Sequence, residues 1–217
     1  CFYRLCVGED RYRGRQACQH AEVMMREEKR KYYKNLQKGH HEPIIKKIFY
    51  KIFENGNFIV CLVPKIDTLT GEVGGAEAVV RYHHKDLGIV DPGRYLNMLE
   101  ETKLSHYLDL YVFEEVCKTL HKWEVRDIPM IPVSVNFAGA TLRQEGLADK
   151  MLHLIEKHHV RCEYLEVEVS ESSSDMNQEM LAETSSKIRK GNVRVILDHF
   201  GAKDSSFSIL SLMEFDG

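Results

Sequence analysis

The sequence lacks any long hydrophobic run. No apolar stretch approaches the roughly 20 residues needed to cross a bilayer, and no signal peptide opens the chain. The basic excess typical of nucleic-acid-binding proteins is also missing, because the formal net charge is −3. These absences predict a cytoplasmic protein, or the cytoplasmic part of a larger one. They disfavour a membrane segment in this chain and a nucleic acid polymer as partner.

Two further motifs are missing. The six cysteines are scattered and form no C-x-x-C pair, so we expect reduced thiols rather than a zinc or redox site. No G-x-G-x-x-G follows an expected strand, which disfavours dinucleotide binding. With 217 residues, 43% hydrophobic and 29% charged, the composition is that of a globular protein. The length suits one large domain, or one domain plus a fragment of another.

Strands and helices alternate along most of the chain. Apolar runs and helical periodicity predict strands at 58–67, 76–84, 131–138, 165–172 and 193–200, and helices at about 92–103, 107–123, 144–158 and 176–189. Upstream, we expect a strand at 1–8 and helices at 14–37 and 43–54. This order is typical of parallel βαβ units and favours a (β/α) barrel, whose chemistry sits at the C-terminal ends of its strands. A doubly wound open sheet is the alternative.

Polar side chains recur on one face of successive strands. Strand alternation predicts that Glu77, Asn136, Glu168 and Asp198 point toward one interior. Carboxylates this close repel one another unless a cation neutralises them, and oxygen-only ligands suit Mg²⁺, Mn²⁺ or Ca²⁺. Arg81 shares the face of Glu77 and suits a phosphate oxygen. A metal beside an arginine indicates phosphodiester chemistry. The alternative is a set of solvated or ion-paired strand residues.

Four stretches together resemble the signature of EAL-domain cyclic-di-GMP phosphodiesterases. They are "TLTGEVGGAEAVVRYHHKDLGIVDP", "PVSVNFA", "LEVEVSES" and "ILDHFGAKDSS", and the resemblance covers about residues 43–217. It implies an α/β fold, a (β/α)8 TIM-like barrel of EAL type over residues 39–217. The barrel would be incomplete in this chain, which holds about five of the eight strands. Residues 1–38 resemble the last strand and helix of a GGDEF-like α/β domain.

The resemblance also implies roles for individual residues. Glu77, Asn136, Glu168 and Asp198 match the family's metal ligands, which implies Mg²⁺ or Mn²⁺ as cofactor and cyclic-di-GMP as ligand. Arg81 matches a residue that contacts the substrate phosphate, and Glu171 matches a glutamate that steadies the loop at 200–206. The family's lysine lies on a strand expected to begin past Gly217, so no catalytic residue is assigned.

The chain departs from the family at several of these places. His199 stands where the family has a second metal-binding aspartate, and imidazole ligates Mn²⁺ or Zn²⁺ but is a poor Mg²⁺ ligand. Val63 replaces a glutamine that contacts substrate, and valine offers no hydrogen bond. Lys203 and Asp204 replace a glycine and an aromatic residue of the loop.

These departures leave three interpretations. The first is a degenerate EAL domain of a bacterial signalling protein, with little or no catalysis and the metal lost, which works as a binding or interaction module. The second is an active phosphodiesterase with an altered metal preference, in which His199 ligates Mn²⁺. The third is a receptor that binds cyclic-di-GMP without hydrolysing it. A signalling protein or a second copy of the chain is the expected protein partner.

Overall fold

The structure is a computed structural model of the 217-residue chain. It describes residues 58–84, 88–90, 96, 99, 104–170, 178–199, 210 and 213–217. The chain divides into two compact units, one of residues 1–59 and 81–95 and the other of residues 60–80 and 96–217. The elements expected before residue 55, including the GGDEF-like segment, lie outside the described residues. So does most of the helix expected at 92–103, of which Leu96 and Leu99 are described and helical.

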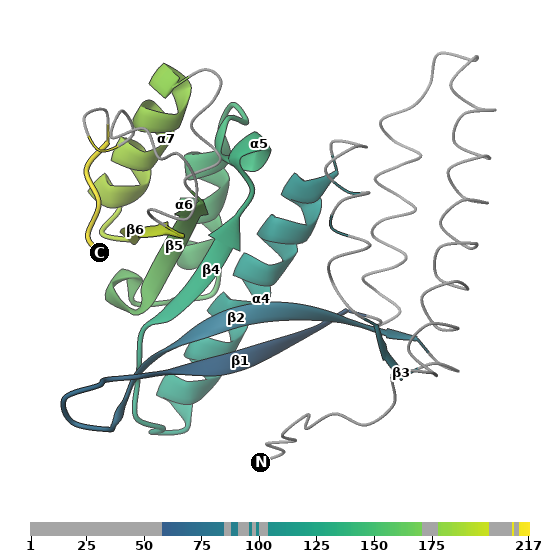
Figure 1. The fold of residues 1–217 in the computed structure, drawn as a ribbon, viewed down its shortest axis with the longest axis vertical. Coiled ribbons are helices and arrows are strands. Elements are labelled where there is room, and N and C mark those ends of the chain that lie inside the picture. The colour runs from purple at the N-terminus through teal and green to yellow at the C-terminus, as the bar shows by residue number, and fades with distance from the viewer. Residues whose placement is uncertain are drawn as a thin grey trace. The chain divides into compact units, whose positions relative to one another are not determined.

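The strands form one mixed sheet (Figure 1). Its order is β1-β2-β4-β5-β6, and β3 pairs with β2. Their bounds are β1 Phe58–Ile66, β2 Val73–His84, β3 Gly88–Val90, β4 Val133–Phe137, β5 Leu165–Ser170 and β6 Arg194–Asp198. The strands β2, β4, β5 and β6 are parallel, whereas β3 is antiparallel to β2. The five strands predicted from the sequence are confirmed to within a few residues.

One feature of the sheet differs from the prediction, the short strand β3. It was not predicted, because three residues are too few to display a period of two. A turn joins β1 to β2, as the stretch "TLTGEVGG" predicts, so the alternation of strand and helix begins only with β2. Asp67 fixes this turn, since its Oδ1 accepts hydrogen bonds from the backbone N–H groups of Leu69 at 2.8 Å and Thr70 at 3.1 Å. Gly71 adopts a φ of 75°, which glycine reaches without steric cost.

The helices of the second unit pack on the sheet and on one another. Their bounds are α4 Ser105–Val125, α5 Gly139–Leu142, α6 Leu147–Lys157 and α7 Gln178–Lys190. Helix α4 contacts β4 and α7 contacts β6, while α6 lies against both helices (Figure 1). The short α5 was not predicted, since four residues carry no helical periodicity. Within the described ranges, no helix combines the length and the hydropathy that spanning a membrane requires.

The core lies between these helices and the central strands. Val133, Val135, Leu165 and Val167 are inaccessible to solvent, and on α4 the buried side chains follow helical spacing. The rings of Phe113 on α4 and Phe137 on β4 meet edge to face, with centroids 5.9 Å apart. The sheet is therefore buried by its helices on the face that carries these aliphatic side chains, which leaves the other face for polar ones.

The exit of β4 is held by a side chain of α4. Asp109 Oδ2 accepts hydrogen bonds from the backbone N–H of Ala138 at 3.0 Å and from the Thr141 hydroxyl at 2.5 Å. Thr141 is fully buried. The carboxylate thus satisfies an otherwise unpaired donor at the start of α5, as a capping residue does. It also fixes the backbone two residues after Asn136.

The residues after α7 return to the edge of β6. Asp216 N donates to Val195 O at 2.7 Å, and Leu197 N donates to Gly217 O at 2.9 Å. Arg189 on α7 holds the Asp216 carboxylate through Nε at 3.1 Å and Nη2 at 3.0 Å. This guanidinium lowers the pKa of Asp216 below its ordinary value, and the backbone N–H of Val195 lowers it further.

Replacing Asp109 with alanine should destabilise the fold. The substitution leaves the Ala138 N–H and the buried Thr141 hydroxyl without this acceptor, which costs about 1–3 kcal/mol. Urea unfolding measures the loss. The control is Glu156→Ala on α6, which removes an exposed carboxylate and should change the free energy of unfolding by no more than about 0.5 kcal/mol. An equal effect of the two substitutions would contradict this role of Asp109.

Asp216 should make stability depend on pH in the acid range. Because its folded pKa is lowered, the stabilisation is present above its unfolded pKa near 4 and is lost as pH falls through the folded value. Solvent screening limits the effect to about 1 kcal/mol. Asp216→Asn should flatten this part of the pH profile in thermal unfolding. Glu214→Gln, which alters an 85% exposed partner of the same arginine, should not.

Candidate functional site

The register of the parallel strands decides which polar side chains share a face. Glu77 is paired with Ser134, Asn136 with Glu168, and Ser170 with Asp198. Paired residues of neighbouring strands lie on the same face, and so do residues two apart on one strand. Glu77, Asn136, Glu168 and Asp198 therefore lie on one face, as predicted. They occupy three pairing rows, with Asn136 and Glu168 in the same row, and cross the sheet as a diagonal.

The first pair of this diagonal is bonded directly. Asn136 Nδ2 on β4 donates to Glu77 Oε1 on β2 at 2.7 Å. The contact uses the amide nitrogen, so the amide oxygen, which is the atom a metal ion would bind, stays outside this bond. Two predicted ligands from adjacent strands thus touch in the structure.

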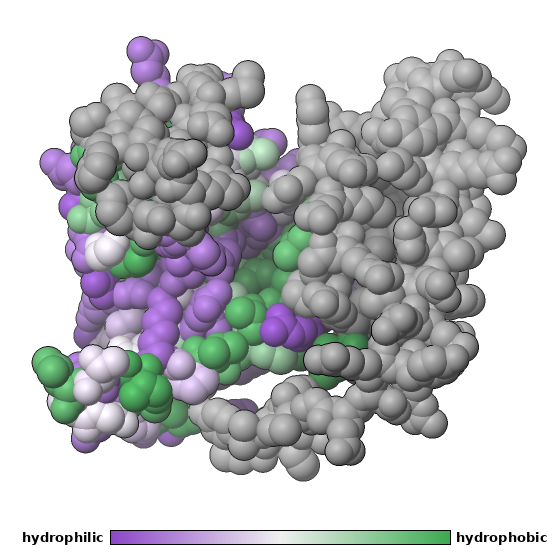
Figure 2. All heavy atoms as spheres, viewed as in Figure 1, coloured by the Kyte–Doolittle hydropathy of each residue, from purple (hydrophilic) through white to green (hydrophobic). Residues whose placement is uncertain are grey.

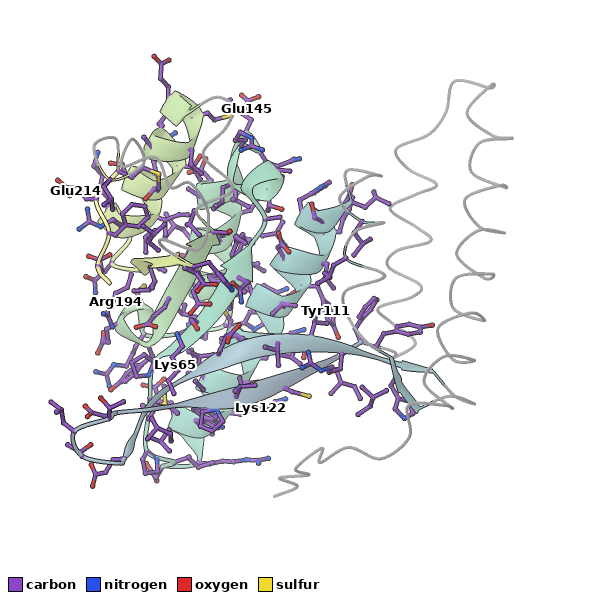
Figure 3. The ribbon with its side chains drawn as sticks, in the orientation of Figure 1. Lys65, Tyr111, Lys122, Glu145, Arg194 and Glu214 are labelled. Carbon is purple, nitrogen blue, oxygen red and sulfur yellow. The ribbon has the colours of Figure 1, made fainter. Side chains whose placement is uncertain are left out.

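Glu168 is bonded to a residue that was not predicted. Lys65 Nζ on β1 donates to Glu168 Oε1 at 2.6 Å and lies 3.7 Å from Glu166 Oε2. Glu166 also pairs with Arg194 of β6. The two carboxylate side chains are only 10% and 7% exposed, so each needs a counter-charge to remain ionised there. Figure 3 labels Lys65 of β1 and Arg194 of β6, the two cations that pair with these carboxylates.

This network requires a curved sheet. Two strands, β2 and β4, separate β1 from β5 in the sheet order. In a flat sheet, three strand spacings would put β1 about 14 Å from β5, and side chains standing perpendicular to it would not meet. The contact between Lys65 and Glu168 shows that the sheet curls around the polar face. The sheet therefore curls toward this face, on which Glu166 and Glu168 are nearly buried while Asn136 is exposed.

Asp198 and His199 form a local pair at the end of β6. The His199 backbone N–H donates to Asp198 Oδ1 at 2.8 Å, and His199 Nδ1 lies 2.5 Å from Asp198 Oδ2. His199 has a φ of 57°, a left-handed conformation in which histidine is enriched over most other residues. The strand predicted to reach residue 200 ends at Asp198 for this reason. The imidazole is 71% exposed.

The predicted ligands have the chemistry of a hard-cation site, but their side chains do not converge. In the described part of the chain, no group of three or more histidine, cysteine, aspartate or glutamate side chains is placed to hold a metal ion. The carboxylates of Glu77, Glu168 and Asp198 instead bond to Asn136, Lys65 and His199. The oxygen donors fit Mg²⁺ or Mn²⁺ by type, and a cation would have to compete with these bonds.

The remaining predicted residues are less informative. Arg81 lies further along β2, in the first compact unit, where it is half-buried. Glu171 and the loop at 200–206, with Lys203 and Asp204, lie outside the described residues. Val63 on β1 is 45% exposed. Lys65 was not predicted as a site residue. Its position two residues after Val63 places both side chains on one face of β1, and this spacing is a signal that could have indicated it.

Two kinds of side chain stand out on the face of the molecule that Figure 2 shows. Hydrophilic side chains dominate the region in front of β4–β6, whereas hydrophobic ones gather at the turn between β1 and β2. The exposed hydrophobic residues there are Ile66, Leu69 and Val73.

Comparisons with known sequences point to one family. The family model described as EAL domain matches residues 47–217. The cyclic di-GMP phosphodiesterase NbdA of Pseudomonas aeruginosa is 27% identical over 153 residues, which are 70% of this chain and 20% of that protein. The signaling protein YkoW of Bacillus subtilis is 25% identical over 163 residues, 75% of this chain and 20% of that protein. The chain thus spans about a fifth of the length of these relatives.

Solved structures share the fold. The Pseudomonas aeruginosa FimX EAL domain bound to c-di-GMP has a TM-score of 0.67 at 18% identity and covers 79% of this chain and 68% of that one. The PaMucR phosphodiesterase in complex with c-di-GMP has a TM-score of 0.70 at 23% identity, covering 77% and 68%. These likenesses identify the curled sheet and its helices as part of a TIM-barrel-like α/β fold. The family model covers most of the sequence, and the chain therefore belongs to the EAL domain family.

Proposed function

We propose that this protein is a degenerate EAL domain that binds cyclic-di-GMP or a signalling partner and hydrolyses cyclic-di-GMP weakly or not at all. The observation that carries the proposal is the replacement at the end of β6. There an exposed imidazole, His199, bonds to Asp198, where the family pattern has two adjacent carboxylates. Imidazole supplies no negative charge and is a poor Mg²⁺ ligand, so a second metal position is weakened.

Relatives supply the ligand class. NbdA is named as a cyclic di-GMP phosphodiesterase, and FimX and PaMucR are described with c-di-GMP bound. We infer that cyclic-di-GMP is the nucleotide for this chain too. Arg81 would contact a phosphate oxygen of the ligand through its guanidinium. Val63 cannot form the hydrogen bond of the glutamine it replaces, which weakens nucleotide binding on that side.

The polar face of the sheet carries the candidate ligands of a metal. Glu77, Asn136, Glu168 and Asp198 would hold Mg²⁺ or Mn²⁺ in a loaded site. The chemistry that a bound metal would supply there is activation of a water molecule and stabilisation of charge on phosphate oxygens. The chain's own groups limit that chemistry, because Lys65 and His199 occupy the carboxylates of Glu168 and Asp198. Weak metal binding follows from this competition.

The second candidate function is an active phosphodiesterase with an altered metal preference. It is favoured by the diagonal on the polar face, since Glu77, Asn136, Glu168 and Asp198 keep the residue types of four of the family's ligand positions and share one side of the sheet. In that case His199 ligates Mn²⁺ and activity is higher with Mn²⁺ than with Mg²⁺.

The setting of the domain is also proposed. Residues 39–217 would form the EAL-like domain, and residues 1–38 would end a GGDEF-like domain before it. Glu171 would steady the loop at 200–206, where Lys203 and Asp204 alter the family pattern. A cytoplasmic location and a signalling protein or a second copy as partner complete the proposal.

Ligand binding and turnover separate the candidates. We expect calorimetry to detect cyclic-di-GMP binding and chromatography to show hydrolysis at least about a hundredfold slower than an active EAL phosphodiesterase, the loss typical of a missing catalytic group. Arg81→Ala should abolish the binding, while the surface variant Arg161→Ala should keep it. Hydrolysis at the rate of the active enzyme with Mg²⁺ or Mn²⁺ would contradict degeneracy.

His199→Asp tests the weakened metal position. An added carboxylate should raise Mn²⁺ affinity about tenfold, because it contributes charge and a hard oxygen ligand. Under the degenerate interpretation hydrolysis stays low, since Val63 and the altered loop remain. The control is His153→Asp, which adds the same charge at an exposed position of α6. Full recovery of hydrolysis by His199→Asp alone would favour the active enzyme instead.

A further inference from the structure

Lys65 is the one cation from β1 that contacts both nearly buried carboxylates of β5 in the described structure. Its ammonium lies 2.6 Å from Glu168 and 3.7 Å from Glu166. It comes from β1, the first strand of the sheet order, and reaches β5, from which β2 and β4 separate it. This side chain therefore connects β1 with β5, two strands that share no backbone hydrogen bonds.

The four charged groups form a balanced set. Glu166 and Glu168 carry two negative charges, and Lys65 and Arg194 carry two positive ones. Removing either carboxylate from water is costly unless a cation stays beside it. The set is thus stable without a bound metal. A divalent cation at Glu168 would place two further positive charges beside the ammonium of Lys65.

The two cations differ in how readily they could move away from the carboxylates. Arg194 pairs with Glu166, and its Nη2 also donates to the backbone oxygen of Asp216 at 3.4 Å. Lys65 contacts only the carboxylates in the bonds described, its side chain is 39% exposed, and its stem is flexible. An ammonium at the solvent boundary can withdraw into water when another cation takes its place.

We propose that Lys65 is an internal counterion of the metal site, which competes with the divalent cation for Glu168. It stabilises the metal-free protein and lowers the affinity of the site for the metal. Filling the site then requires a higher metal concentration than the ligands alone would require. The inference rests on the proposed function in one respect, the assignment of Glu168 as a metal ligand.

Substitution of Lys65 should change metal affinity and metal-free stability in opposite directions. For Lys65→Met we expect Mn²⁺ to bind about tenfold more tightly, because a positive charge next to the site is gone. In EDTA its Tm should fall by several degrees, because Glu168 and Glu166 lose a counter-charge. Electron paramagnetic resonance of free Mn²⁺ measures binding, and calorimetric unfolding measures Tm, both on the full chain and without substrate.

Three variants serve as controls. Lys65→Arg keeps the charge and should keep Mn²⁺ affinity near that of the unsubstituted protein. Lys187→Met removes an exposed lysine that pairs with Glu183 at 3.0 Å on α7, and it should change neither quantity. In the double variant Lys65→Met with Glu168→Gln, Tm should fall by less than the sum of the falls in the two single variants. The reason is that the carboxylate of Glu168, which Lys65→Met leaves unpaired, is gone.

The outcomes test the metal site and the counterion role of Lys65 separately. Tighter Mn²⁺ binding with a lower metal-free Tm for Lys65→Met supports the counterion role. If Mn²⁺ binds the unsubstituted protein and Lys65→Met equally, and Glu168→Gln abolishes binding, the metal site stands and the counterion role is wrong. If neither the unsubstituted protein nor Lys65→Met binds Mn²⁺ up to millimolar concentration, both the metal site and the counterion role are wrong.

Discussion

The burial of two carboxylates on the central strand β5 is the constraint on which the polar interior depends. Glu166 and Glu168 stand on the same face and are almost withdrawn from water. Leaving them unpaired would cost several kcal/mol each, so the fold supplies cations from both sides. Lys65 arrives from β1 and Arg194 from β6, and only a curled sheet brings the first of these within reach. Curvature and charge neutralisation therefore depend on each other.

The parallel register gives this interior its order. Each strand of the series β2, β4, β5 and β6 contributes one predicted ligand, and the stagger between strands moves the ligands along a diagonal. Such a stagger accompanies strand tilt when a sheet closes toward a barrel. The helices α4 and α7 bury the opposite face, so aliphatic residues take one side of the strands and charged residues the other. The family's fold thus creates the polar interior before any ligand is present.

Much of this arrangement could be predicted from residue patterns. The alternation in "LEVEVS" predicts a strand with Glu166 and Glu168 on one face, and the periodicity of residues 107–123 predicts most of α4. Elements of three or four residues, β3 and α5, escaped prediction because they are too short to repeat the strand or helix period. The end of β6 was also misplaced, since a positive φ at His199 leaves no mark in hydrophobicity.

The sequence alone determined the family resemblance, the residue types of the four ligand positions and the substitution of His199, because these are properties of local order and spacing. The tertiary structure decided which groups those residues contact. Lys65 lies 103 positions before Glu168, and no local pattern links the two. Their contact exists because a curled sheet brings β1 across from β5, and the burial of each carboxylate favours a cationic neighbour.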